Sequence, residues 1–261
     1  MVEQLQQHQS PPQNYGVYKL EFKEDEILDD YRFANHKVLQ FPDIVTLKNE
    51  NNDETKQSLY VFQDFNQGKG GICWDASYVM AKVVERDIIN AEKHIGQKLN
   101  FIELGAATAL PSLLIAGYGH KILATDLKKV VNIITEKCLK LNPDIKGEIQ
   151  AMELSWGNDE HLQMAIDKFE DRKLDYIICA DLIYLDETFE DLVKTLKQLS
   201  SYNPAHTPII FMSYKIRLPE LTQQFIDMLK VEFDIIEELN ILDIHPNPQE
   251  KFIKAMLKKS E

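Results

Sequence analysis

The sequence predicts an α/β fold, in which a mostly parallel sheet carries helices on both of its faces. From residue 73 onward, short apolar segments alternate with segments whose apolar residues recur three or four positions apart. Such alternation is typical of parallel strands joined by crossover helices. The last two strand-like segments have no helical pattern between them, so they must pair as an antiparallel hairpin. We therefore expect the sheet to end in a reversed strand.

A β extension is expected ahead of this region. Residues 36–47 and 58–65 have the pattern of strands, with Pro42 breaking the first, and polar residues 49–55 predict a hairpin loop. Residues 1–16 contain five glutamines and two prolines and are expected to be disordered. The expected divisions are a disordered tail (1–16), an extension with a β-hairpin (17–69) and a main α/β domain (70–261).

The remaining elements follow one another in a regular order. Helices are expected over residues 73–89, 111–119, 128–142, 161–169, 187–199 and 218–230. Strands are expected over residues 100–106, 121–127, 148–154, 174–184, 208–214, 233–241 and 251–257. The loop between the last two strands contains His245, which we expect to be an exposed loop histidine outside the catalytic set.

Composition limits the classes of partner. The 261 residues carry a formal net charge of −13, and a protein without a basic face is a poor partner for duplex nucleic acid. An acidic surface suits a basic protein partner, although solubility alone explains it equally well. No apolar run is long enough to cross a membrane, and residues 1–10 do not resemble a secretory signal. We expect a monomer that binds neither nucleic acid nor membrane.

The cysteines indicate a compartment and argue against a metal site. Cys73, Cys138 and Cys179 are scattered, with no CxxC pair. This spacing predicts neither a disulfide framework nor a metal centre, and it favours a reduced intracellular compartment. We expect the protein in the cytoplasm, and the nucleus stays open as a second location.

The stretch IELGAATALP, residues 102–111, predicts a ligand-binding turn between a strand and a helix. In open α/β sheets, ligands bind outside the carboxyl ends of the strands. Gly105 lets the backbone approach a ligand closely, and the small residues after it keep the loop low. Because alanine does not readily adopt a positive φ, we expect the alanines of this turn to keep negative φ values.

Asp126 ends the next predicted strand, 21 residues after Gly105, where a carboxylate accepts hydrogen bonds from ribose hydroxyls. A dinucleotide fingerprint would require glycines where this chain has Ala107 and Leu110, which disfavours NAD. A cofactor with a ribose and no pyrophosphate, such as S-adenosylmethionine, fits these residues better. The alternative is an ordinary tight turn, with Asp126 as a helix N-cap.

Three further segments accompany ELGAATALP and ATDL: GGICWDAS (70–77), ELSWG (153–157) and ADLIY (180–184). Together, in this order and at this spacing, they resemble methyltransferase family 16, the methyltransferase-like 21 group of protein-lysine methyltransferases. The resemblance runs from about Val38 to Lys258. It implies a Rossmann-like, seven-strand class I methyltransferase sheet with S-adenosyl-L-methionine as cofactor. The implied substrate is a lysine side chain of a non-histone protein, such as an elongation factor or a chaperone-type ATPase.

The resemblance also implies a role for each matched residue. Trp74 lines the cofactor site, Asp126 holds the ribose, and Trp156 lies by the adenine. The residues implied to bind the cofactor are Trp74, Gly105, Ala106, Ala107, Asp126, Trp156 and Ala180. Asp181 and Tyr184, in a D-x-x-Y motif beside the methyl-transfer site, are the implied catalytic residues. Each also has an ordinary structural explanation, as a core tryptophan, a helix cap or a packing tyrosine.

Our hypothesis is that Asp181 positions the lysine nitrogen and that Tyr184 walls the channel. The residues alone leave open whether Asp181 also accepts a proton. Two features depart from the family pattern. The turn keeps only the first glycine of G-x-G-x-G, and Lys215 stands where relatives often carry another residue. The alternatives are a methyltransferase for a small molecule or a protein N-terminus, an inactive binding module, and an NAD-dependent oxidoreductase.

Overall fold

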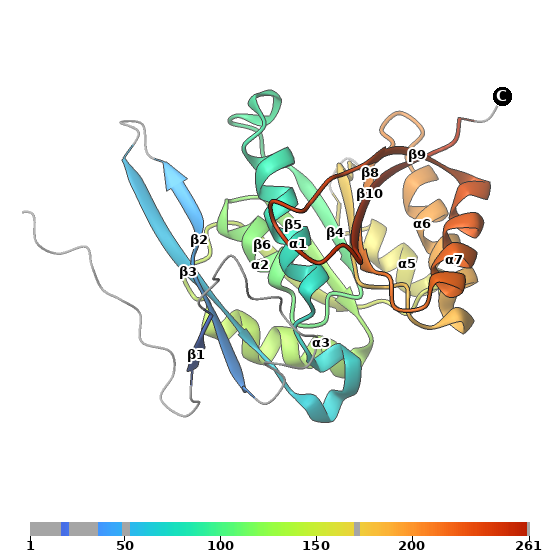
Figure 1. Ribbon diagram of the computed structural model, residues 1–261. Helices are drawn as coiled ribbons and strands as arrows, with labels where there is room; N and C mark the ends of the chain where they lie inside the picture. The colour runs from blue at the N-terminus through green and yellow to red at the C-terminus, as the bar shows by residue number, and fades with distance from the viewer. Residues whose placement is uncertain (1–16, 21–35, 49–52, 170–172, 260–261) are drawn as a thin grey trace, which may run out of the picture.

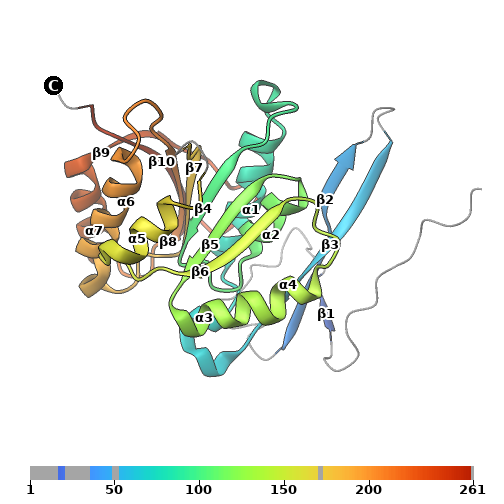
Figure 2. The same ribbon diagram turned by 180° about the vertical axis from the view of Figure 1, so that it is seen from behind.

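The main sheet contains seven strands in the order β6-β5-β4-β7-β8-β10-β9 (Figures 1 and 2). The structure is a computed structural model that describes residues 17–20, 36–48, 53–169 and 173–259. The strands of this sheet are β4 (Asn100–Leu104), β5 (Lys121–Asp126), β6 (Glu148–Glu153), β7 (Tyr176–Ala180), β8 (Ile209–Lys215), β9 (Phe233–Glu238) and β10 (Glu250–Leu257). The first five are parallel, which confirms the predicted α/β class.

The C-terminal hairpin is confirmed, but its reversed strand does not lie at the edge of the sheet as expected. β10 pairs antiparallel with both β8 and β9, so it lies second from the edge. The crossover through α7 (Pro219–Glu232) leaves one strand-wide gap between β8 and β9. The link from β9 to β10 contains no helix, so β10 fills that gap by returning in the opposite direction.

Helices cover both faces of the sheet. On one face lie α1 (Asp75–Val84), α2 (Leu110–Gly117), α3 (Lys128–Ile133) and α4 (Leu139–Leu141). On the other lie α5 (Asp159–Ile166), α6 (Phe189–Ser201) and α7. Strand side chains alternate between the two cores: Ile177 packs with α5, α6 and α7, whereas Ile178 packs with α1. Both cores therefore hold the strand ends in fixed positions.

Short helical segments of other types connect these elements. η1 (Phe65–Gly71), η3 (Glu92–His94) and η6 (Asp186–Thr188) are 3-10 helices, and η2 (Glu85–Ile89) and η4 (Ile134–Cys138) are π-helical. η2 prolongs α1, so the single predicted helix over residues 73–89 is an α-helix that ends in a wider turn.

The predicted β extension is a three-stranded sheet of β1 (Val17–Lys19), β2 (Val38–Lys48) and β3 (Glu54–Phe62). β2 and β3 form the expected hairpin, and β1, which was not predicted, pairs parallel with β2. Pro42 does not end its strand, because a register shift between Phe41 and Val45 accommodates its missing N–H. Residues 1–16, expected to be disordered, and residues 49–52 of the hairpin loop lie outside the described residues.

This N-terminal sheet packs against α2 and the segment from α3 to α4, on the side of the molecule opposite α6 and α7 (Figures 1 and 2). The division of the chain at residue 69 stays a prediction. Among the helices of the described residues, none has both the length and the apolar content needed to cross a membrane.

His245 is buried, and the expectation of an exposed loop histidine was wrong. Its side chain is 3% exposed, and its Nε2 lies 3.6 Å from Oδ2 of Asp75 at the start of α1. The backbone N–H of His245 donates to the Ile241 carbonyl at 2.8 Å, and this turn folds the loop inward. The loop composition alone contains no signal for that packing.

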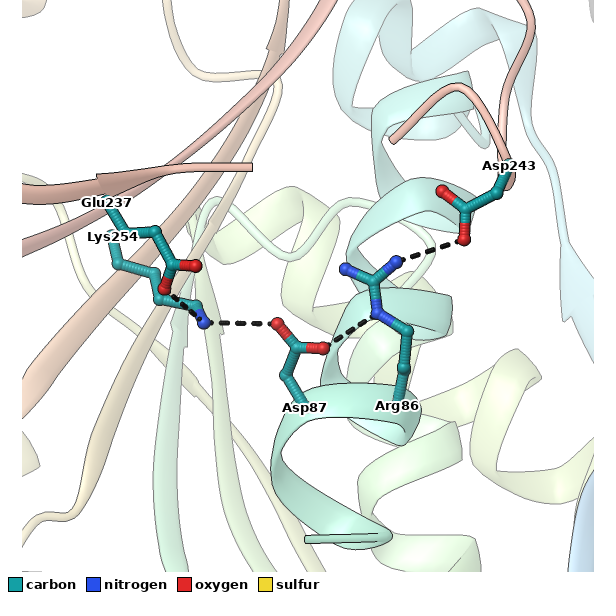
Figure 3. Close-up of polar contacts among 5 residues, drawn as sticks. All are labelled: Arg86, Asp87, Glu237, Asp243 and Lys254. Atoms are coloured by element: carbon teal, nitrogen blue, oxygen red, sulfur yellow. Dashed lines mark hydrogen bonds and ion pairs between the residues drawn. The ribbon is translucent and has the colours of Figure 1, made fainter. Parts of the chain in front are cut away.

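An ion-pair network joins η2 to the C-terminal hairpin (Figure 3). Asp87 accepts a hydrogen bond from Arg86 Nε at 2.7 Å and lies 3.1 Å from Nζ of Lys254. Lys254 also pairs with Glu237 at 2.8 Å, and Arg86 pairs with Asp243 at 3.1 Å. Burial alone would raise the pKa of Asp87, but hydrogen bonds from Arg86 and Lys254 outweigh it and hold that pKa below its usual value.

We predict that Asp87→Asn lowers the free energy of unfolding by about 1–2 kcal/mol, because Lys254 and Arg86 lose a shared, mostly buried anion. Asp243→Asn is the matched control, because Asp243 also pairs with Arg86 but is more exposed. The Asp243 side chain is 62% exposed, whereas the Asp87 side chain is 17% exposed. The control should cost less than about 0.5 kcal/mol. Urea unfolding at pH 7 measures both, and equal losses would contradict the prediction.

Candidate active site

A cavity of about 600 Å³ opens at the carboxyl ends of β4, β5 and β7. Eight of the nine predicted site residues line it, namely Trp74, Gly105, Ala107, Asp126, Trp156, Ala180, Asp181 and Tyr184. They come from five segments that are distant in the sequence. Four of these segments end or follow β4, β5, β6 and β7, whose carboxyl ends lie together because the strands are parallel, and Trp74 precedes α1.

Ala106 is the exception. Its side chain is 2% exposed and packs with Ala109, Ala124 and Val130, away from the cavity. Its backbone N–H donates to the Thr125 carbonyl at 2.9 Å, which links the turn to β5. Ala106 therefore anchors the turn in the core, and a direct contact with a ligand stays a prediction.

The turn after β4 has an unusual backbone. Gly105, Ala107 and Ala109 have φ values of 59°, 48° and 56°. The expectation of negative φ was therefore wrong for Ala107 and Ala109, and each costs about 1–2 kcal/mol of backbone strain. Hydrogen bonds compensate: the Ala107 N–H donates to Oδ2 of Asp126 at 2.9 Å, and the Ala109 N–H donates to the Ala106 carbonyl at 2.6 Å.

Gly105 is needed for a second reason besides its φ. A Cβ at this position would lie 2.6 Å from Cδ2 of Leu182 and 3.3 Å from Cζ2 of Trp156. The backbone of the turn thus lies directly against side chains that follow β7 and β6. A larger residue would force the Leu182 side chain to move and would change the lining of the cavity.

Glu103 supports the turn from within the core. The side chain is almost fully buried in β4, and one carboxylate oxygen accepts hydrogen bonds from the backbone N–H of Ser112, at 3.1 Å, and from its hydroxyl. The N-cap of α2 is Ala109, which has no side-chain acceptor, so Glu103 satisfies the first turn of that helix from a neighbouring strand. Burial, reinforced by the nearby charge of Asp126, raises the pKa of Glu103 to about 8.

Asp126 is the carboxylate that the sequence assigns to a ribose. Its Oδ2 accepts from Ala107 and its Oδ1 from the Leu127 N–H at 2.7 Å. Burial raises the pKa of Asp126, and these two N–H groups partly offset that rise. Neither donor belongs to the first turn of α3, so Asp126 is not its N-cap. Each oxygen keeps a free lone pair that is able to accept a hydrogen bond from a hydroxyl group.

A further part of the cavity lining is built around Asp181, directly after β7. Its side chain is 5% exposed, its φ is 60°, and its backbone N–H donates to the Ser213 carbonyl at 2.8 Å. Both carboxylate oxygens accept from the Arg217 guanidinium, at 2.8 Å and 2.7 Å. That guanidinium lies 5.4 Å from the Trp74 ring centroid. Asp181 is therefore held in a bidentate ion pair and does not act as a simple helix cap.

Tyr184 and Lys69 form the side of the cavity nearest to η1. The Lys69 ammonium lies 4.3 Å from the Tyr184 ring centroid, and the Lys69 carbonyl accepts from Nε1 of Trp74 at 2.9 Å. Burial raises the pKa of Tyr184, and the carboxylates of Asp126 and Asp181 add to the rise. The face of an aromatic ring attracts ammonium groups, so this contact between Lys69 and Tyr184 is a cation–π interaction.

Sequence reasoning missed several cavity residues. These are chiefly Lys69, Leu182, Leu185, Thr188, Asp191 and Arg217. Arg217 had a signal, since it is a basic residue two positions beyond the end of β8, at the same edge of the sheet. Its partner was not apparent, because pairing with Asp181 depends on the neighbouring positions of β7 and β8.

We predict that Glu103→Gln changes how stability depends on pH. The folded protein holds a proton on Glu103 up to about pH 8, whereas an unfolded glutamate, with a pKa near 4.5, releases it earlier. The wild type therefore loses stability as pH rises through this window, by up to about 1.4 kcal/mol per pH unit. The stability of the variant relative to wild type should rise between pH 5 and pH 8.

Thermal unfolding at the two pH values measures this change. Glu148→Gln is the control, because an ion pair with Lys98 lowers the pKa of Glu148, which is then ionised in both states over the whole window. A relative stability of Glu103→Gln that does not change with pH would mean that Glu103 is already ionised in the folded protein.

The sequence of this chain is similar to those of known protein-lysine methyltransferases. Protein N-lysine methyltransferase METTL21A of Mus musculus is 29% identical over 180 residues, which are 68% of this chain and 75% of that protein. Protein-lysine methyltransferase METTL21E of the same species is 30% identical over 193 residues, 72% of each chain. Protein-lysine N-methyltransferase EFM6 of Saccharomyces cerevisiae is 28% identical over 185 residues, 65% of this chain and 73% of that protein.

Solved structures are more distant. Magnesium protoporphyrin IX methyltransferase from Synechocystis, with bound SAH, is 14% identical, with a TM-score of 0.46 and coverage of 70% of this chain and 81% of that one. Residues 53–232, which make up more than half of the chain, match the lysine methyltransferase family. The resemblance inferred from the motifs is thereby confirmed, and this protein belongs to the lysine methyltransferase family.

Proposed function

We propose that this protein transfers a methyl group from S-adenosylmethionine to a lysine side chain of a non-histone protein. The observation that carries the proposal is one cavity lined together by Asp126, by the turn after β4, and by Asp181 and Tyr184. An elongation factor or a chaperone-type ATPase is the substrate class that the family resemblance favours.

The residues around the cavity fit S-adenosylmethionine. Its volume of about 600 Å³ is in the range of small-molecule sites. Asp126 has free lone pairs for two ribose hydroxyls, and Trp156 offers an aromatic face for the adenine. The N–H groups of Ala106 and Ala107 already donate within the protein, so the turn contributes its shape and Gly105 its close backbone approach. Trp74 and Ala180 complete the proposed cofactor wall.

The cofactor supplies an activated methyl group, and the protein must present a neutral amine to it. A free lysine has a pKa of about 10.4, so neutralising it at pH 7 costs about 4–5 kcal/mol. The apolar walls of the cavity lower that pKa by disfavouring the ammonium ion. Asp181 accepts a hydrogen bond from the amine and so directs the lone pair of its nitrogen, and Tyr184 walls the channel and excludes water.

We predict that the wild-type protein, incubated with radiolabelled S-adenosylmethionine and a cell lysate, labels lysine in one or a few protein bands. Asp181→Ala should abolish the labelling and retain most cofactor affinity, because Asp181 acts on the acceptor. Asp186→Ala removes an exposed carboxylate outside the cavity and should label normally. Label in small molecules or at a protein N-terminus would contradict the lysine assignment. Cofactor binding without any transfer would favour an inactive module.

We predict that Asp126→Ala weakens S-adenosylmethionine binding by about 10- to 100-fold, because two charge-assisted hydrogen bonds to the ribose are lost. Isothermal titration calorimetry measures the affinity. Asp191→Asn is the matched control, because Asp191 is a second carboxylate of the cavity to which we assign no ribose contact. Unchanged affinity in Asp126→Ala would leave Asp126 only its role in holding the turn.

A further inference from the structure

The ion pair between Arg217 and Asp181 is built more firmly than a chance surface contact. Two nearly equal hydrogen bonds of 2.8 Å and 2.7 Å join the planar guanidinium to the carboxylate. The Asp181 side chain is 5% exposed and that of Arg217 is 32% exposed, so water screens the pair only in part. The Trp74 ring lies against the guanidinium. The ends of β7 and β8 therefore fix both the position of Asp181 and its counter-charge.

The pair changes what Asp181 offers to an incoming amine. A carboxylate has about four lone-pair directions, and a bidentate arginine uses two of them. Asp181 therefore keeps the ability to accept a hydrogen bond while Arg217 cancels its charge. A carboxylate whose charge is cancelled attracts a neutral amine almost as well as it attracts an ammonium ion. A bare carboxylate would strongly prefer the ammonium ion.

This difference matters for methyl transfer, since the ammonium ion has no lone pair with which to attack. An unpaired carboxylate within about 4–6 Å raises the pKa of an amine by about 1–3, which reduces the neutral fraction at pH 7 by about 10- to 1,000-fold. We propose that Arg217 is a positioning residue that prevents Asp181 from trapping the acceptor lysine in its protonated form. The proposal rests on the lysine methyltransferase function argued above.

The other charged groups around the cavity support this reading. Its lining residues include three carboxylates, Asp126, Asp181 and Asp191, and three cations, Lys69, Lys129 and Arg217. With Arg217 in place their formal charges balance, and without it the cavity is anionic. A balanced cavity has no net preference for a cation. This contrasts with the net charge of −13 on the whole chain, which attracts basic segments to the surface.

The experiment uses n-butylamine, which has the length and the amino group of a lysine side chain, and reads its effect on the unfolding temperature of the full chain. For an amine with a pKa of about 10.4, the neutral fraction grows about 300-fold between pH 7 and pH 9.5. The wild type, which favours the neutral amine, should be stabilised more at pH 9.5 than at pH 7. Burial raises the pKa of Tyr184, which favours its protonated form.

Arg217→Gln should reverse this dependence. With Asp181 unpaired, the variant should bind the butylammonium ion, and millimolar amine should raise its unfolding temperature by a few degrees at pH 7. Each protein is compared with and without amine, so a lower starting stability does not affect the result. Arg217→Lys keeps the charge and should behave like the wild type. Asp181→Asn combined with Arg217→Gln should lose the response at pH 7.

Two results would overturn the proposal. One is an equal response of the wild type and Arg217→Gln at pH 7, and the other is a response of Arg217→Gln that persists in the double variant. Sodium chloride and n-butanol at matched concentrations control for salt and for apolar binding. The measurement involves no methyl transfer, so its failure is distinct from a failure of the wild type to label proteins in a lysate.

Discussion

Two acidic side chains, those of Asp126 and Glu103, hold the turn after β4 in a backbone conformation that its sequence disfavours, and the site depends on that turn. Asp126 accepts a hydrogen bond from the N–H of Ala107, and Glu103 accepts hydrogen bonds from the N–H and the hydroxyl of Ser112 in the first turn of α2. Without the Asp126 acceptor, the positive φ at Ala107 would be uncompensated strain. Glycine at these positions would adopt the same conformation at lower strain. This chain obtains it through hydrogen bonds from neighbouring strands.

Much of the fold and of the site was predictable because both depend on local patterns. Alternating strands and helices indicated the parallel sheet, and parallel strands bring Gly105, Asp126 and Asp181 to one edge whatever their separation in sequence. Trp74 and Trp156 came only from the family resemblance. The positive φ at Ala107 was not predictable, because it is supported by a hydrogen bond to Asp126 at the end of another strand.

Features that arise from pairing between elements were also missed. The position of β10 inside the sheet depends on the gap that the crossover through α7 leaves between β8 and β9. The pairing of β1 with β2 involves three residues of each strand. His245 is buried because a loop folds under α1, and loop composition does not show that packing. The sequence showed Arg217 as a basic residue near a strand end, but only the structure showed that it pairs with Asp181.

The two sides of the cavity are built on different pairs of strands. β4 and β5 provide the turn and Asp126, whereas β7 and β8 provide Asp181 and Arg217, fixed by the hydrogen bond from Asp181 to Ser213. The sides meet where Gly105 contacts Leu182, because the absent Cβ leaves the space that the leucine fills. The distance between donor and acceptor in methyl transfer must be held within a fraction of an ångström. The contact between Gly105 and Leu182 therefore bears on that distance, because a Cβ at position 105 would force the Leu182 side chain to move.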